Sequence, residues 1–350
     1  MSKSAEWFFG FTFEYVPENH SNVKNFSTFL DEATRDKMTS QAVDFCKKLR
    51  YASAGTIEFL VDTSSNFYFL EMNTRLQVEH AVTEFITGVD IVEEMIRVSG
   101  GYKLSLTQDD VKVNGWAVES RVYAENPFKD FGAPNTGRIG GYIEPPCSKS
   151  VRCDSGVEEG SEISIYYDSM ISKLICHGRN REDAINGSVS ALDRYTITGV
   201  SHNIPMLRDI LTEENFSRGY INTNYLNSVY PAGYKSRPLS QDEKLKLISI
   251  MVALFVSKDQ KSREYLNEQR ILIHATKSEE WTLVLMMDEE CFHVEVRQGN
   301  GFLNVEVEGR RFEVPRKLNV TSPVLEVVVD DEEMFVQHIN TDASGNCSLR

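Results

Sequence analysis

Five polar residues occupy every second position between Phe69 and His80: Glu71, Asn73, Arg75, Gln77 and Glu79. Side chains of an extended chain alternate between two faces, so a single strand would place all five in one row. The positions between them hold Met72, Thr74, Leu76 and Val78, which form a mostly apolar opposite face. A row of carboxylate, amide, cation, amide and carboxylate can hold a metal ion, an anion and a base. This segment is therefore the first candidate for chemistry.

A second carboxylate is predicted to meet the start of this row. Residues 57–61 and 67–72 are rich in β-forming residues and flank the turn-prone sequence Asp-Thr-Ser-Ser-Asn, a pattern that predicts a hairpin. Such a hairpin places Glu58 near Glu71, and the apolar residues around both predict that they are buried. Two buried like charges need a counter-ion. With the Asn73 amide oxygen they suit Mg²⁺ or Mn²⁺ that carries nucleotide phosphates. The alternative is a pair of solvated strand carboxylates.

The second half of the row fits an anion and a base. The planar guanidinium of Arg75 matches a carboxylate-shaped oxyanion, and Gln77 with the backbone of Val78 completes a cradle. Glu79 lies beyond them, where a general base would reach a proton on the bound anion. The competing interpretation is a set of solvated polar side chains. His80 is interpreted as a hydrogen-bonded structural residue.

Two further charged residues stand in apolar strand patterns. Arg121 shares a strand face with Glu119 and Tyr123. On its own this indicates an ion pair, which contributes little when it is exposed. Lys173 enters an apolar run, where a lysine that only extends its amine to the surface and a lysine with a function fit the pattern equally well.

The composition excludes several classes of protein. The chain has 350 residues, of which 41% are hydrophobic and 25% are charged, which is typical of a globular protein of two or three domains. A net charge of −15 argues against nucleic-acid binding, and no apolar run reaches the roughly 18 residues of a membrane span. Six scattered cysteines indicate free thiols in a reducing compartment. No P-loop, dinucleotide-binding, nucleophile-elbow or H-E-x-x-H motif is present.

The remaining pattern predicts a mixed chain with a β-rich end. Helical spacing covers residues 30–50, with Asp31 as the candidate N-cap, and residues 82–98, which stop at Gly100. Residues 112–175 are β-rich, and helices follow at 181–195 and 204–212 before a boundary at residues 230–233. A helix over residues 240–269 precedes short strands, which are typical of a small sandwich or barrel. These strands are predicted at 281–287, 291–297, 302–308, 311–314, 324–329 and 334–338.

The segment from Phe69 to His80 resembles the signature of biotin carboxylases, a branch of the ATP-grasp ligases. Four other segments resemble the same family in the same order: AGTIEFL at 54–60, TEFITGVD at 83–90, VESRVYAENP at 118–127 and YYDSMISKL at 166–174. The resemblance extends from about residue 28 to residue 350. It is strongest toward the alpha subunits of propionyl-CoA carboxylases.

The resemblance implies an ATP-dependent ligase that activates bicarbonate and carboxylates biotin held on another domain. It assigns roles to the residues already singled out. The ligands of Mg²⁺ or Mn²⁺ would be Glu58, Glu71 and Asn73. The bicarbonate-binding residues would be Arg75, Gln77 and Val78. Glu79 would deprotonate bicarbonate, and Arg121 would stabilise the biotin enolate, a role that replaces the simple ion-pair interpretation.

The resemblance also implies an α+β fold in four segments. These are a divergent N-terminal segment (1–27), the C-terminal half of an ATP-grasp module (28–103), the biotin carboxylase C-terminal domain (104–232) and a truncated biotin-transport-like domain (236–350). The last would combine a helix with a small, incomplete antiparallel β-barrel. The family's nucleotide lid, phosphate-binding lysines and biotinylated lysine are expected to fall outside the chain. The ATP site would then be partial, and the chain is interpreted as truncated at both ends relative to the family.

The resemblance finally implies a partner and a location. Residues 236–350 would bind a carboxylase beta subunit. The location would be the mitochondrial matrix, although no presequence is visible and the cytoplasm stays open. Two other interpretations remain: a non-catalytic module that binds such a subunit through residues 236–350, or else a translated relic, and another ATP-grasp carboxylate–amine ligase. The Arg75–Glu79 run and the β-rich end disfavour the second of these.

Overall fold

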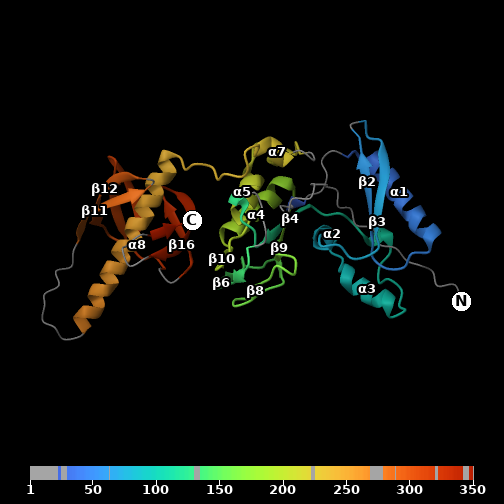
Figure 1. Ribbon diagram of the computed structural model, residues 1–350, viewed down its shortest axis with the longest axis horizontal. Coiled ribbons are helices and arrows are strands. Elements are labelled where there is room, and N and C mark those ends of the chain that lie inside the picture. Colours follow the sequence, from blue (N-terminus) through green and yellow to red (C-terminus); the bar gives the residue numbers. More distant parts are fainter. Residues whose placement is uncertain are drawn as a thin grey trace. The chain divides into compact units, whose positions relative to one another are not determined.

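The chain divides into two compact units, Met1–Ser236 and Arg237–Arg350, each with its own hydrophobic core (Figure 1). The computed structural model describes residues 23–24, 30–62, 64–129, 135–221, 225–268, 279–287, 289–319, 322–341 and 347–349. The predicted N-terminal segment lies almost entirely outside the described residues. No helix among the described residues is long and apolar enough to cross a bilayer.

A helix and a hairpin form the first part of the first unit. Helix α1 (Glu32–Leu49) begins after Asp31, as predicted, because the Asp31 carboxylate accepts a hydrogen bond from the N–H of Thr34 at 2.7 Å. Strands β2 (Thr56–Val61) and β3 (Phe67–Asn73) form the predicted antiparallel hairpin. Four apolar side chains of this hairpin are exposed: Leu60, Tyr68, Phe69 and Leu70. The hairpin therefore presents an uncovered apolar surface.

Residues 80–99 form two helices instead of the single predicted one. Helix α2 (His80–Thr87) ends at Gly88, whose φ of 72° lies in the left-handed region that favours glycine. Helix α3 (Ile91–Ser99) then begins after Asp90, whose carboxylate accepts from the N–H of Glu93 at 2.8 Å. The predicted end at Gly100 is confirmed.

A four-stranded antiparallel sheet forms the centre of the first unit, in the order β1-β4-β9-β7. Its strands are β1 (Val23–Lys24), β4 (Trp116–Tyr123), β9 (Met170–Gly178) and β7 (Val151–Ser155). Helices α4 (Arg181–Asp193) and α5 (Ile204–Thr212), labelled in Figure 1, are the two predicted helices. Their apolar residues share one core with β4 and β9. This sheet carries the charged residues described below.

Short elements complete the first unit. Strand β5 (Gly137–Arg138) pairs with β8 (Glu162–Ile163), and β6 (Gly141–Ile143) pairs with β10 (Thr196–Thr198). The remaining helices are η1 (Gln108–Asp110), η2 (Pro127–Lys129), α6 (Glu214–Arg218) and α7 (Tyr225–Val229). Elements of two to five residues are too short to show a period in sequence, which is why β10, α6 and α7 escape prediction.

The second unit is one long helix with antiparallel strands, as predicted. Helix α8 spans Gln241–Glu268. One sheet has the order β11-β12-β13-β14, and the other has the order β15-β16-β17. The strands are β11 (Glu280–Met287), β12 (Glu290–Gln298), β13 (Phe302–Val307), β14 (Arg310–Pro315), β15 (Val324–Val329), β16 (Glu332–Thr341) and β17 (Cys347–Leu349). In the described part of this unit the strands thus form two sheets, with alternate residues buried in a core that α8 completes.

Candidate active site

The two hairpin carboxylates lie opposite each other. Glu58 on β2 is the register partner of Glu71 on β3, as the hairpin pattern predicts. Asn73 joins them, because its Nδ2 donates to Glu58 Oε1 at 2.9 Å and to Glu71 Oε1 at 3.0 Å. Both carboxylates therefore point at one position. Glu71 is exposed and Glu58 is half-buried, so the prediction of two buried carboxylates is wrong.

Residues 74–79 form a loop and do not continue β3. The ladder between β2 and β3 ends where Thr56 faces Asn73, and among the described residues no strand pairs with the chain beyond it. The alternation of side chains needs such a partner to persist, so the row predicted for one strand ends at Asn73. The loop still approaches the carboxylates, since Gln77 Nε2 donates to Glu58 Oε1 at 3.2 Å.

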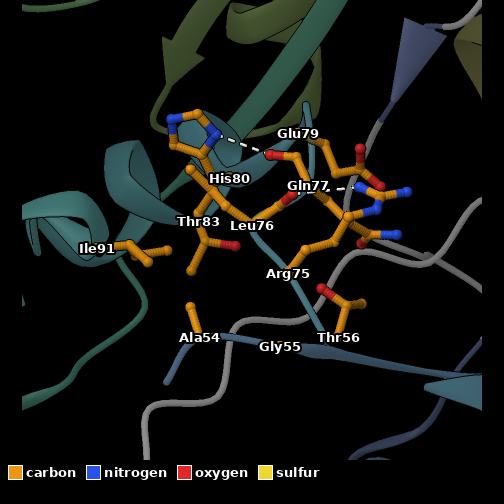
Figure 2. Close-up of a pocket in the computed structure, with 10 residues that line it drawn as sticks. All are labelled: Ala54, Gly55, Thr56, Arg75, Leu76, Gln77, Glu79, His80, Thr83 and Ile91. Atoms are coloured by element: carbon orange, nitrogen blue, oxygen red, sulfur yellow. Dashed lines mark hydrogen bonds between the residues drawn. The ribbon is translucent and has the colours of Figure 1, made fainter. Parts of the chain in front are cut away.

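A small pocket of about 40 Å³ lies where this loop meets the start of β2 and the first turn of α2 (Figure 2). Arg75 and Gln77 of the predicted cradle line it together with Glu79, whereas Val78 is not among the lining residues. The other lining residues are Ala54, Gly55, Thr56, Leu76, His80, Thr83 and Ile91. Arg75 is exposed and donates to the carbonyl of Leu76 at 3.1 Å. Gln77 Oε1 is buried without a hydrogen-bond partner, which marks a position for the donor of a ligand.

Glu79 and Arg121 meet in a buried ion cluster. Arg121 Nη2 donates to Glu79 Oε2 at 2.7 Å, and Arg121 Nε donates to Glu119 Oε1 at 3.1 Å. The side chains of Arg121, Glu79 and Glu119 are 11%, 10% and 0% exposed. An exposed strand pair would contribute little, but here removal of the cation would leave two carboxylates buried. The local pattern had connected Arg121 with Glu119 only.

The electrostatics of this cluster follow from burial and pairing. Burial raises the pKa of Glu119 above its ordinary value, although the guanidinium of Arg121 works against that rise. Burial alone would lower the pKa of Arg121, but the carboxylates of Glu119 and Glu79 outweigh it and raise that pKa. Arg121 therefore stays charged next to Glu79.

Two side chains, Lys173 and His80, contact backbone carbonyls of the loop of residues 74–79. Lys173 Nζ donates to the carbonyl of Val78 at 2.8 Å and lies 3.2 Å from Asp154 Oδ2. His80 Nδ1 lies 2.8 Å from the carbonyl of Gln77, which agrees with the structural role predicted for this histidine. Lys173 is 8% exposed, so its amine does not extend to the surface.

Asn203 is a residue that the sequence did not single out. It is fully buried, and its Oδ1 accepts from the N–H of Tyr123 at 2.9 Å while its Nδ2 donates to the carbonyl of Arg121 at 3.1 Å. The amide thus acts like the peptide of a neighbouring strand and fixes the backbone that carries Arg121. A buried asparagine just before Ile204-Pro205 at the start of α5 is a weak signal, and the contact spans about 80 residues.

Comparisons with known proteins show what the chain is similar to. Three family models match successive parts of the chain: "Carbamoyl-phosphate synthase L chain, ATP binding domain" (residues 18–107), "Biotin carboxylase C-terminal domain" (119–228) and "Propionyl-coenzyme A carboxylase BT domain" (247–350). The biotin carboxylase domain of Hydrogenobacter thermophilus 2-oxoglutarate carboxylase, solved with MgADP and bicarbonate, superposes with a TM-score of 0.57 at 42% identity over 60% of this chain and 46% of that one.

A second solved structure gives the same result. The biotin carboxylase subunit of a pyruvate carboxylase superposes with a TM-score of 0.58 at 39% identity over 62% of this chain and 48% of that one. The fold and the matched models define the class: over residues 18–228 the chain is similar to biotin carboxylases, a family of ATP-grasp proteins. The predicted resemblance and fold class are confirmed.

Within this family the chain is similar to propionyl-CoA carboxylase alpha chains. It is 46% identical over 325 residues to the mitochondrial protein of Rattus norvegicus, which covers 93% of this chain and 44% of the relative. The human protein gives 46% over 324 residues with the same two shares. The chain thus spans less than half the length of these relatives.

Proposed function

We propose that the first unit binds a divalent cation and bicarbonate for a biotin carboxylase reaction. In that reaction ATP activates bicarbonate, and biotin on another domain is carboxylated. One observation carries the proposal: Arg75, Gln77 and Glu79 line a single pocket, and Gln77 links that pocket to the carboxylate of Glu58. An oxyanion and a cation could therefore be held side by side.

The hairpin residues fit a hard cation. Both carboxylates lie within 3.0 Å of the Asn73 amide nitrogen, so a cation in that place would meet two anionic oxygens. Rotation of the Asn73 amide would add a third oxygen ligand. Bound Mg²⁺ or Mn²⁺ would offset the charge of the ATP phosphates and orient them.

The pocket fits bicarbonate. A volume of about 40 Å³ holds roughly three waters, which suits an ion of four heavy atoms and not a nucleotide. Arg75 would bind the anion, together with Gln77 and the Val78 backbone. The unpaired Gln77 Oε1 would accept a hydrogen bond from the bicarbonate hydroxyl before Glu79 removes that proton.

Glu79 and Arg121 would carry the proton transfer and the later charge. Arg121 at 2.7 Å favours the ionised carboxylate, which is the form that a general base needs. Once Glu79 has taken the proton and become neutral, the guanidinium of Arg121 would be available to an enolate oxygen of biotin.

Metal and anion binding by the whole chain test this proposal. Mn²⁺ titrations followed by electron paramagnetic resonance should show weak binding that Glu71→Gln reduces, while Glu93→Gln, on the exposed face of α3, has no effect. The ¹³C signal of labelled bicarbonate should broaden with wild type and not with Arg75→Met. Equal Mn²⁺ titrations for wild type and Glu71→Gln would remove the metal assignment, and no broadening with wild type would remove the bicarbonate assignment.

The similarity to propionyl-CoA carboxylase alpha chains supports a wider proposal. The carboxyl group on biotin would serve acyl-CoA carboxylation of the propionyl type, and the location would be the mitochondrial matrix, as for those relatives. Another ATP-grasp ligase is the alternative. Carboxylation of free biotin by the chain, supplied with ATP and the remaining part of a biotin carboxylase, would separate the two.

We further propose that residues 236–350 bind a carboxylase beta subunit. The second unit has its own core between α8 and the two sheets, so it can present a binding surface without the site of the first unit. Phe255 is exposed on α8 at 52% and is a candidate contact. Capture of a purified beta subunit by the chain, weakened by Phe255→Ser and not by Phe302→Ser, would support this. No capture would leave the interaction module without support.

A further inference from the structure

Side chains on one face of the central sheet form hydrogen bonds with two successive residues, Val78 and Glu79, of the candidate anion loop (residues 74–79). The strand register places Arg121 opposite Lys173, and Lys173 opposite Asp154, so the three form a row across β4, β9 and β7. Two members of this row reach the loop: Arg121 binds the Glu79 carboxylate at 2.7 Å, and Lys173 binds the Val78 carbonyl at 2.8 Å. The proposed function assigns a role to Arg121 and leaves Lys173 without one.

The contact of Lys173 fixes a peptide direction. A trans peptide points its C=O and the next N–H to opposite sides. A Val78 carbonyl held toward Lys173 therefore turns the N–H of Glu79 away from it. In the same way the ring of His80 holds the Gln77 carbonyl at 2.8 Å and turns the N–H of Val78 away. Both peptides of the loop between Gln77 and Glu79 are thus oriented by side chains outside it.

The bonding partners of the Lys173 amine can be assigned. A carbonyl only accepts hydrogen bonds, so His80 Nδ1 must carry the proton that it donates to Gln77. Nδ1 therefore cannot accept from Lys173, although it lies 3.5 Å away. The amine is left with the Val78 carbonyl at 2.8 Å and Asp154 Oδ2 at 3.2 Å.

We propose that Lys173 is a positioning residue of the bicarbonate site: it holds the Val78 peptide, and through it the Glu79 side chain, in the orientation that binds and deprotonates the anion. This inference rests on the proposed function. Lys173 acts by geometry more than by charge, because its amine also lies 3.2 Å from Asp154 Oδ2, a carboxylate that it shares with Arg152. If the only role of Lys173 were to extend its amine into solvent, the residue would be largely exposed. Only 8% of its surface is exposed.

The chain offers a matched control. Lys246 on α8 is also 8% exposed and pairs with two carboxylates, Asp242 at 2.8 Å and Glu332. Lys246→Met therefore removes an equally buried lysine from the other unit. Lys173→Met removes the donor and keeps the apolar stem, and Lys173→Arg keeps a donor.

Bicarbonate and Mn²⁺ binding to the full chain, with hydrogen exchange of residues 77–82, test the inference. We expect Lys173→Met to raise the bicarbonate dissociation constant at least about tenfold, as for loss of a hydrogen bond from a charged donor. We also expect it to speed exchange at residues 77–82. Lys173→Arg should restore both to within about threefold, and Lys246→Met should change neither. Mn²⁺ affinity should stay unchanged throughout, because the proposed metal ligands lie on β2 and β3, and this separates positioning from general unfolding.

The two proposals fail in different ways. If wild type binds bicarbonate and Lys173→Met binds it equally well, the positioning role is overturned. If Lys173→Met loses Mn²⁺ as well, the residue is a structural support and the role is again overturned. If wild type binds no bicarbonate, the proposed function falls, and the role of Lys173 in that site falls with it. If wild type binds bicarbonate, weaker binding and faster exchange in Lys173→Met but not in Lys173→Arg support the role, and unchanged exchange overturns it.

Discussion

Replacing Arg121 with methionine should destabilise the first unit strongly. The change leaves two carboxylates without their cation, Glu119 with a side chain 0% exposed and Glu79 with one 10% exposed. Removal of one partner from a buried ion pair costs about 3–5 kcal/mol. A whole domain is stable by only about 5–15 kcal/mol. We therefore expect Arg121→Met to remove a large share of the free energy of unfolding of this unit.

The loss should grow with pH. Glu119 has an ordinary pKa of 4.5, and burial raises its pKa in the folded state. A carboxyl group whose pKa is raised by folding contributes its full stability to the folded state below about pH 4.5, where it is protonated in both states. This contribution to the free energy of unfolding is lost as the pH rises toward the pKa of the folded state. Arg121 opposes the rise, so its removal raises the folded pKa further. The difference between variant and wild type should increase with pH between the folded pKa of wild type and the higher folded pKa of the variant, by up to about 1.4 kcal/mol for each pH unit in that interval.

Urea unfolding at pH 5 and pH 8, followed by hydrogen exchange of the β4 amides, measures this unit separately from the second. The control is Arg218→Met in the same unit, which breaks an exposed pair with Glu214 and should cost less than about 1 kcal/mol. A loss in Arg121→Met no larger than in Arg218→Met, or one that is equal at both pH values, would refute the counter-ion argument.

Three further outcomes follow from the structure. Asn203→Leu should lower stability by about 2–4 kcal/mol, because the buried N–H of Tyr123 and carbonyl of Arg121 each lose a partner; an unchanged melting temperature of the unit would contradict this. The 350-residue chain alone should show no bicarbonate-dependent ATP hydrolysis above background. The pocket of about 40 Å³ suits only the anion, and the reaction also needs a nucleotide that is held beside it in the right geometry. Phosphate release that disappears in Glu79→Gln would prove this wrong. Phe69→Ser should reduce the aggregate fraction measured by light scattering, because Phe69 is 53% exposed on the hairpin. An unchanged aggregate fraction would show that this surface does not cause aggregation.

The sequence by itself determined the features that depend on neighbours in the chain. The hairpin and the pairing of Glu58 with Glu71 follow from two β-rich runs around one turn. The start of α1 follows from its cap, and α4, α5 and the long helix α8 follow from helical spacing. The family resemblance rests on short motifs that can be recognised in the sequence without knowledge of the fold. All of these are local, and local chemistry is what periodicity and motifs report.

Tertiary structure decided the features that depend on distant partners. The row of polar residues could not continue beyond Asn73, because a strand persists only while another strand pairs with it. Exposure of Glu71 was equally invisible, since burial depends on what covers a surface and not on the residues that form it. Arg121 reaches Glu79 across 42 residues, and Lys173 reaches Val78 across 95. Those contacts exist because β4 and β9 are adjacent in one sheet below the loop, and no spacing in the sequence encodes that adjacency.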